Sequence, residues 1–335
     1  MRRADAPNRS RTLCALAVAI VAIGCERGRS HEPAPAPAPA PPPEPAPAPP
    51  AAAGCTIAAL PLRLPAAKRL VAIGDLHGDL AGARAALRAA GALDEHDHWN
   101  GGDLVVVQTG DVLDRGDDER ALLDLLAALE TEAHAAGGAL VLLLGNHELM
   151  NAAGDFRYVT PAGYHAFDDV PGADAAGDAP AQVRSRLAAL GPGHPYARRL
   201  AGHAVIAIVG DTVFSHAGVL GDWVHRVDEV NRSARCWLDG QASEPPAALT
   251  SDDSPVWTRA AGGATVDCAQ VAAALAALHA QRMVVGHTVQ QGGITSACDG
   301  ALWRIDVGLS RHYGGPTQVL EIAPGAAPKI LRGSG

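Results

Sequence analysis

The sequence has no excess of positive charge, no N-terminal apolar run long enough to cross a membrane comfortably, and no internal repeat. Its 335 residues carry a formal net charge of −9, which argues against a broad nucleic-acid surface, so nucleic acid is not an expected partner. The apolar run from Leu13 to Ile23 is shorter than the about 20 residues that a transmembrane helix needs. The C-terminal part of the chain is long enough for one well-buried domain.

Cysteine is scarce, and no pair of cysteines has the spacing of a metal site. Two of the six lie near the N-terminus, at Cys14 and Cys25, and the others are Cys55, Cys236, Cys268 and Cys298. None lies beside a candidate base, so a cysteine nucleophile is not expected. In an oxidising compartment the last four permit disulfides in three pairings, and inert thiols are the alternative.

The first 25 residues have the pattern of an export signal, because arginines precede the apolar run and small residues follow it. The segment Ala22-Ile23-Gly24-Cys25 is similar to a bacterial lipobox, although leucine is usual where Ala22 stands. We therefore expect a signal peptide at 1–25 and a lipid anchor at Cys25 as the only membrane contact. We therefore also expect the protein to reside in the cell envelope. An ordinary cleaved signal is the alternative.

Residues 31–54 are almost entirely proline and alanine. Such a segment cannot bury a core, and proline favours an extended spacer. We expect a disordered tether over 26–65, with a leader of no mechanical role as the alternative. The globular domain is then expected over 66–332.

Strand-like and helix-like stretches alternate through this domain, which predicts an α/β fold with helices covering a sheet. The first strands are expected at 69–73, 104–107 and 139–144, with helices at 81–90 and 118–135. A hairpin (204–208 and 212–215), a helix (222–238), a further helix near 268–280 and a strand (282–285) follow. Two closing strands of a second sheet are expected at 302–307 and 317–322. Residues 152–200, rich in Gly, Pro and Asp, read as an insertion over the site.

Five short polar segments stand beside the apolar runs. They are Gly74-Asp75-Leu76-His77-Gly78-Asp79, Gly110-Asp111-Val112-Leu113-Asp114-Arg115-Gly116, Gly145-Asn146-His147-Glu148, Ser215-His216-Ala217-Gly218 and Gly286-His287-Thr288. Taken alone, the Asp75 and His77 pair, Asp111 and Asn146 are common turn residues, and a buried histidine such as His216 is more often a hydrogen-bonded core residue. Together the segments supply oxygen and imidazole ligands that suit Mn, Fe or Zn. Two metals held close together clamp the attacking and leaving oxygens of an in-line displacement, which is phosphoester chemistry.

These segments resemble those of the calcineurin-like metallophosphoesterases, and 110–116 and 145–148 resemble the phosphoprotein phosphatase branch. Three longer runs, 145–151, 154–158 and 255–259, are similar to the Shewanella-like protein phosphatases. The resemblance covers about residues 69–322. It implies an α/β/β/α sandwich of two mixed sheets flanked by helices, with the metal site at the C-terminal ends of the strands.

The resemblance also implies two divalent metal ions, with Mn favoured and Fe or Zn as alternatives, and a metal-bridging hydroxide that attacks phosphorus. Asp75, His77 and Asp111 would hold one ion. Asp111 would bridge to a second ion, whose other ligands would be Asn146, His216 and His287.

The same resemblance implies candidate roles in catalysis or substrate binding for five further residues. His147 is the candidate general acid, held by Asp114, or else it only supports the metal ligands. Arg115 suits a phosphate because its planar fork meets two oxygens. Arg259 is a second phosphate candidate, with a surface salt bridge as its alternative, and Tyr313 is expected to line the pocket.

The last polar segment helps to distinguish a phosphodiesterase from a phosphomonoesterase. Many phosphodiesterase relatives carry Gly-His-x-His there, whereas this chain has Gly286-His287-Thr288-Val289. We therefore expect an exported, metal-dependent phosphomonoesterase that acts on phosphoproteins or small phosphoesters. A dinucleoside polyphosphate hydrolase is the enzymatic alternative. A phosphate-binding or surface-interaction protein is the non-enzymatic one.

Overall fold

The computed structural model describes residues 54–173 and 179–333. The expected signal peptide, the anchor at Cys25 and most of the expected tether lie outside these residues. Within the described ranges, no helix combines the length and the apolar character needed to cross a membrane.

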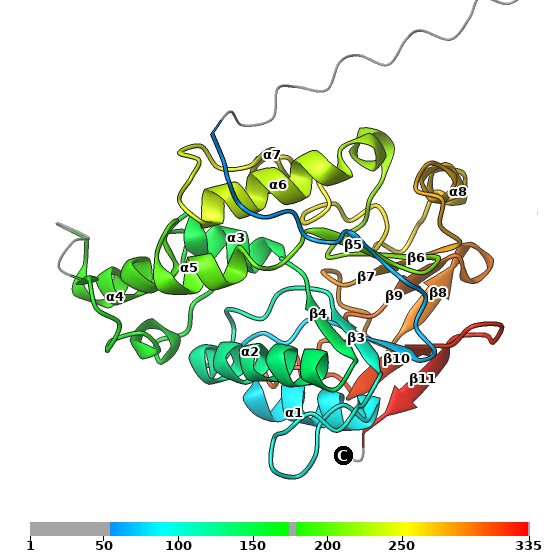
Figure 1. The fold of residues 1–335 in the computed structure, drawn as a ribbon, viewed down its shortest axis with the longest axis horizontal. Coiled ribbons are helices and arrows are strands. Elements are labelled where there is room, and N and C mark those ends of the chain that lie inside the picture. The colour runs from blue at the N-terminus through cyan, green and yellow to red at the C-terminus, as the bar shows by residue number, and fades with distance from the viewer. Residues whose placement is uncertain (1–53, 174–178, 334–335) are drawn as a thin grey trace, which may run out of the picture. The chain divides into compact units, whose positions relative to one another are not determined.

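One sheet contains the first three strands of the domain. β2 (Leu70–Ile73), β3 (Val105–Gln108) and β4 (Ala139–Leu142) run parallel. β10 (Gln318–Ile322) pairs antiparallel with β2, and β11 (Lys329–Arg332) pairs antiparallel with β10, which gives the order β11-β10-β2-β3-β4. Helices α1 (Leu80–Ala90) and α2 (Glu119–Ala135) pack against this sheet (Figure 1).

The second sheet has the strand order β1-β5-β6-β7-β9-β8. Its strands are β1 (Arg63–Leu64), β5 (Ile206–Val209), β6 (Thr212–Ser215), β7 (Arg282–Val285), β8 (Thr295–Ala297) and β9 (Leu302–Arg304). Helix α6 (Val227–Leu238) packs against β5, and the short α7 (Ala247–Thr250) packs against α6. Buried side chains of both sheets and their helices form one continuous apolar cluster. The expected sandwich of two mixed sheets flanked by helices is therefore confirmed.

Two of the expected elements differ from the structure. The strand expected at 317–322 is wrongly assigned to the second sheet, because β10 pairs with β2 in the first. The helix expected at 222–238 is broken at Arg226, where the 3₁₀ helix η3 (Gly221–His225) ends and α6 begins.

The folded domain begins earlier than the expected tether boundary at residue 65. Cys55 forms a disulfide with Cys236 in α6, and β1 pairs with β5. The second disulfide joins Cys268, at the start of α8 (Cys268–Ala277), to Cys298 in η4 (Cys298–Gly300). All four cysteines of the described residues are therefore paired.

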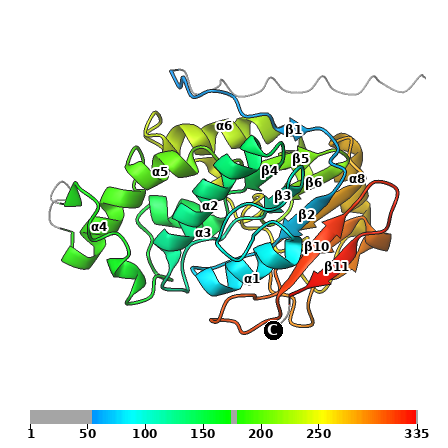
Figure 2. The same ribbon diagram turned by 60° about the horizontal axis from the view of Figure 1, so that its bottom comes forward.

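The insertion at 152–200 has its own helices. It follows α3 (Asn146–Ala152) and contains η1 (Gly163–His165), α4 (Ala181–Leu190) and α5 (Pro195–Leu200). Figures 1 and 2 show α4 at one end of the domain, beside α3 and α5 and away from β10 and β11. The first part of the insertion, up to Tyr158, reaches the site described next.

Candidate metal centre and phosphate site

The predicted ligands follow the carboxyl ends of strands in both sheets. Asp75 and His77 come after β2, and Asp111 comes after β3. Asn146 begins α3 after β4, while His216 and His287 follow β6 and β7. The carboxyl ends of parallel strands meet at one edge of a sheet, so the fold gathers these residues from five separate segments.

Asp111 lies at the centre of the cluster. Its Oδ2 atom is 3.2 Å from His216 Nε2, 3.8 Å from His77 Nε2 and 3.7 Å from His147 Nε2. Two groups of potential metal ligands therefore share Asp111: one with His77 and His147, the other with His216 and His287, each with ligand atoms within 4.8 Å of one another. A carboxylate shared by two ligand groups is suited to bridge two cations.

The other two predicted ligands also lie in the cluster. Asn146 Oδ1 is 2.9 Å from His216 Nε2. The Nδ2 atom of Asn146 donates to the sulfur of Met150 at 3.7 Å. The Asp75 carboxylate accepts a hydrogen bond from the backbone N–H of His287, at 3.1 and 3.2 Å from its two oxygens. The structure thus brings all six predicted ligands near Asp111, but Asp75 belongs to neither of the two ligand groups, and His147 takes its place in the first.

Backbone carbonyls orient three of the imidazoles. His77 Nδ1 is 3.1 Å from Leu113 O, and His216 Nδ1 is 2.9 Å from Thr109 O. His287 is turned the other way, with Nε2 at 3.1 Å from Trp257 O. A nitrogen that donates to a carbonyl leaves the opposite nitrogen with a free lone pair. In each ring that second nitrogen faces the cluster, as metal coordination requires.

The loops that carry these residues are held in an unusual backbone conformation. Of nine non-glycine residues with positive φ among the described residues, five are predicted site residues: His77, Asp111, Asp114, Arg115 and His287. Such strain persists only where surrounding contacts enforce it, and it concentrates at functional sites. Buried Glu148 supplies such contacts, because its carboxylate accepts hydrogen bonds from the backbone N–H groups of Gly145, Asp111, Val112 and Leu113 at 2.7–3.1 Å.

Burial and crowding perturb the acidic groups here. Burial, with the neighbouring Asp306 and Asp111 carboxylates, raises the pKa of Asp75 well above its usual range. Burial opposes ionisation of Asp111, but the imidazoles of His216 and His147 outweigh it and hold its pKa well below its usual range. Burial lowers the pKa of His77 to about 4 and that of His287 to about 3, so both rings are neutral at neutral pH. Neutral imidazoles and clustered carboxyls without a thiolate fit a divalent metal site.

His147 and Asp114 form a buried pair beside this cluster. Their Nδ1 and Oδ2 atoms are 2.5 Å apart, and Asp114 is fully buried. Burial opposes protonation of His147, but the Asp111 and Asp114 carboxylates outweigh it and raise its pKa to about 9. With Nδ1 bound to Asp114, Nε2 is directed at the cluster, which suits proton donation there.

Arg115 has a buried nitrogen with no protein partner. The Nε atom forms no hydrogen bond within the described residues, and the guanidinium stacks on Tyr158, 4.1 Å from its ring centroid. The ring centroid of Tyr313 lies 5.8 Å from the guanidinium carbon and 5.5 Å from the ring of His77. An unsatisfied N–H in a fixed guanidinium fits an anionic ligand such as a phosphoryl group.

Arg259 and Tyr313 both reach the site. Arg259 Nη1 donates to Thr288 Oγ1 at 3.2 Å and lies 3.4 Å from His287 O. It makes no ion pair within the described ranges, so the alternative of a surface salt bridge is not supported. Tyr313 is 39% exposed, and its expected place in the lining of a pocket stays a prediction.

Two residues near the site were not predicted from the sequence. Asp306 is only 1% exposed; its Oδ1 accepts from Gly308 N, and its Oδ2 has no partner in the described part of the chain. Burial, together with the Asp111 carboxylate, raises the pKa of Asp306 to about 6. The other is Tyr158. The apolar neighbours Ile305 and Val307 could have revealed Asp306 as a charge inside an otherwise strand-like run.

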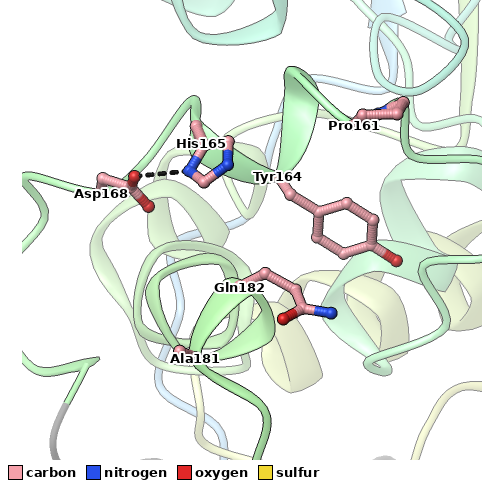
Figure 3. Close-up of a pocket in the computed structure, with 6 residues that line it drawn as sticks. All are labelled: Pro161, Tyr164, His165, Asp168, Ala181 and Gln182. Carbon is pink, nitrogen blue, oxygen red and sulfur yellow. Dashed lines mark hydrogen bonds and ion pairs between the residues drawn. The ribbon is translucent and has the colours of Figure 1, made fainter.

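A separate hollow of about 660 Å³ lies on the insertion, away from every predicted site residue. Figure 3 shows its lining, in which His165 Nδ1 contacts Asp168 Oδ2 at 2.8 Å. The other lining residues are Pro161, Tyr164, Ala181 and Gln182. None of the described residues that line this hollow is an arginine, a lysine or a predicted site residue.

Comparisons with known proteins are consistent with this geometry. A family model described as calcineurin-like phosphoesterase matches residues 68–291, which include all five polar segments. Shewanella-like protein phosphatase 2 of Arabidopsis thaliana is 37% identical over 310 residues, covering 81% of this chain and 79% of the relative. Shewanella-like protein phosphatase 1 of Plasmodium berghei is 28% identical, covering 74% and 69%. A solved cold-active protein tyrosine phosphatase superimposes with a TM-score of 0.66 at 25% identity, covering 78% of this chain and 75% of that one.

Proposed function

Because the chain belongs to the calcineurin-like phosphoesterase family, we propose that this metal-dependent phosphatase hydrolyses phosphomonoesters with two divalent metal ions. The observation that carries the proposal is the sharing of Asp111 between two ligand groups, one in each half of the cluster. Mn²⁺ is the ion to test first, with Fe and Zn as alternatives, since the ligands are oxygens and imidazoles.

One ion would be held by Asp75, His77 and Asp111. The other would be held by Asp111, Asn146, His216 and His287. When bound, the two ions supply Lewis acidity toward the phosphoryl oxygens and a water activated for in-line attack.

The chain's own side chains position the ester and provide a proton. The unsatisfied Nε–H of Arg115 binds a phosphoryl oxygen, and Tyr158 holds the guanidinium flat from one side. His147, whose Nδ1 contacts Asp114 Oδ2, donates its Nε2 proton to the leaving oxygen as the phosphorus–oxygen bond breaks.

Phosphoproteins are the proposed substrates, with phosphotyrosine as the first candidate. Two relatives are named protein phosphatases, and one similar solved structure is a protein tyrosine phosphatase. The tyrosine rings of residues 158 and 313 flank Arg115 and offer stacking surfaces to an aryl phosphate. A phosphoserine side chain cannot use these surfaces.

The test measures hydrolysis of phosphotyrosine and phosphoserine peptides, p-nitrophenyl phosphate and diadenosine tetraphosphate, each with Mn²⁺ and after chelation. We expect turnover of the monoesters that is lost on chelation and restored by the metal, with phosphotyrosine preferred. Faster turnover of diadenosine tetraphosphate would support the alternative hydrolase. No turnover with any metal would reject the enzymatic proposal.

We also propose that the protein is exported and anchored at Cys25 in the cell envelope. The two disulfides support an oxidising compartment, because such bonds are rare in reducing ones. Replacing the anchor residue by Cys25→Ser should release the protein from the membrane fraction. Unchanged partitioning would rule out lipid attachment at this cysteine.

A further inference from the structure

A buried arginine from the insertion reaches the residue that holds His147. Arg186, in α4, is fully buried, and both Nη atoms contact Glu119 of α2, at 2.6 and 2.8 Å. Its Nε donates to Asn151 Oδ1 at 2.8 Å, and Nη2 lies 3.6 Å from Asp114 Oδ1.

The partners of Arg186 in turn hold Asp114. Glu119 Oε1 accepts from the backbone N–H of Asp114 at 2.5 Å. Asn151 Nδ2 lies 3.0 Å from Asp114 Oδ1 and 2.9 Å from the carbonyl oxygen of His147. Asp114 is thereby fixed on one side by Asn151 and Glu119, which leaves its Oδ2 for His147 Nδ1.

The charges along this path alternate in sign. They run from the Asp114 carboxylate to the Arg186 guanidinium and then to the Glu119 carboxylate. Buried ions are tolerated only where each is paired, and loss of one partner leaves an uncompensated charge. Arginine suits the central position, since one planar charged group reaches Glu119, Asn151 and Asp114 and also donates to the carbonyl oxygen of Gly163 at 2.9 Å.

We propose that Arg186 is a positioning residue for His147, acting through Asp114, so that the insertion helix α4 sets the geometry of proton donation. This inference rests on the proposed function. The proposal predicts that the loss of rate depends on the leaving group of the ester, because only the proton-donating step depends on His147. An ester with a good leaving group needs little proton donation, whereas one with a poor leaving group needs it strongly.

The experiment compares p-nitrophenyl phosphate with phenyl phosphate for the wild type and Arg186→Met, both loaded with Mn²⁺. We expect kcat for phenyl phosphate to fall about 10- to 100-fold, as for loss of other supporting contacts at metal sites. The kcat for p-nitrophenyl phosphate should fall less than about threefold. Arg184→Met, on the same helix and outside this network, should leave both rates unchanged.

An independent measurement needs no turnover. In the metal-free protein, the proton between His147 Nδ1 and Asp114 should give a strongly downfield NMR resonance, because their contact is short. The resonance should broaden or move upfield in Arg186→Met and persist in Arg184→Met.

A second variant covers the case in which Arg186→Met does not fold. Glu119→Gln/Arg186→Met removes both charges together and keeps an acceptor for the Asp114 N–H, which avoids an uncompensated buried ion. The same selective loss is expected. Equal losses with both esters, or an unmoved resonance, would reduce Arg186 to a structural role. An inactive wild type would instead count against the proposed function, and the resonance would still report on Arg186.

Discussion

Asp111 is the residue on which both ligand groups of the candidate metal centre depend. Asp111→Asn keeps the size of the side chain but removes the charge that two cations would share. We expect kcat for p-nitrophenyl phosphate to fall more than about 100-fold, since even supporting residues of metal sites cost 10- to 100-fold. Turnover and metal content per chain, by mass spectrometry, are the measurements.

The matched control is Asp103→Asn, because Asp103 is exposed and, among the residues that the structure describes, forms an ion pair only with Lys68. It should retain wild-type turnover and metal content. Normal metal content and turnover in Asp111→Asn would contradict the bridging role.

Gly145 has a packing requirement of its own. A Cβ atom at this position would overlap the Oδ1 atom of Asp111, so Gly145→Ala must displace the carboxylate. We expect Mn²⁺ affinity to fall about 10- to 100-fold by calorimetric titration. Gly292 faces open space and serves as the control. Equal affinities for Gly145→Ala and Gly292→Ala would show that the loop yields without moving Asp111.

The sequence predicted the residues of the metal cluster better than the groups that hold those residues in place. Asp75, Asp111 and His287 were readable because each stands just after an apolar strand. The groups that orient the imidazoles are backbone carbonyls, such as Trp257 O. Every residue type has a backbone carbonyl, so the sequence does not show which ones take this role. Arg186 was missed for a related reason: its partner Glu119 is 67 residues away in sequence, and helix periodicity does not reveal such a pairing.

At the scale of elements, the two disulfides constrain loops of very different length. Cys55 and Cys236 are 181 residues apart, and Cys268 and Cys298 are 30 apart. The chain-entropy relation predicts that the longer loop contributes about 1.6 kcal/mol more to the free energy of unfolding. Urea denaturation of Cys55→Ser/Cys236→Ser and Cys268→Ser/Cys298→Ser should show the larger loss in the first pair. A larger loss in the second would contradict the entropic origin.

Element types were more predictable than their partners. Strand 317–322 was recognised by its apolar residues, yet its place beside β2 was not. Apolar alternation specifies that a strand has a buried face but not which sheet accepts it, because strand pairing depends on contacts distant in sequence. The cysteine pairing was open for the same reason, since composition fixes only the number of pairings.

For the whole molecule, the two sheets meet at a buried acidic centre. Asp75, Asp111, Glu148 and Asp306 are all at most 3% exposed, and burial raises the pKa of three of them, Asp75, Glu148 and Asp306. The first sheet supplies the loops of Asp75 and Asp111, and the second supplies those of His216 and His287. A cation bound between them would therefore link the two halves of the sandwich and would stabilise the folded state relative to the unfolded chain.

Metal removal should consequently lower the thermal stability of the whole domain. A cation present at 100 times its dissociation constant adds about 2.7 kcal/mol to the free energy of unfolding, which corresponds to a rise in Tm of about 5 °C or more. We expect Mn²⁺ to raise the Tm of the wild-type protein, after chelation of its metal, by this amount in scanning calorimetry. The Asp103→Asn variant should show the same rise in Tm. Asp111→Asn should lose most of the rise, because its site lacks the shared carboxylate. An equal rise in Asp111→Asn would place the stabilising ion elsewhere on the protein.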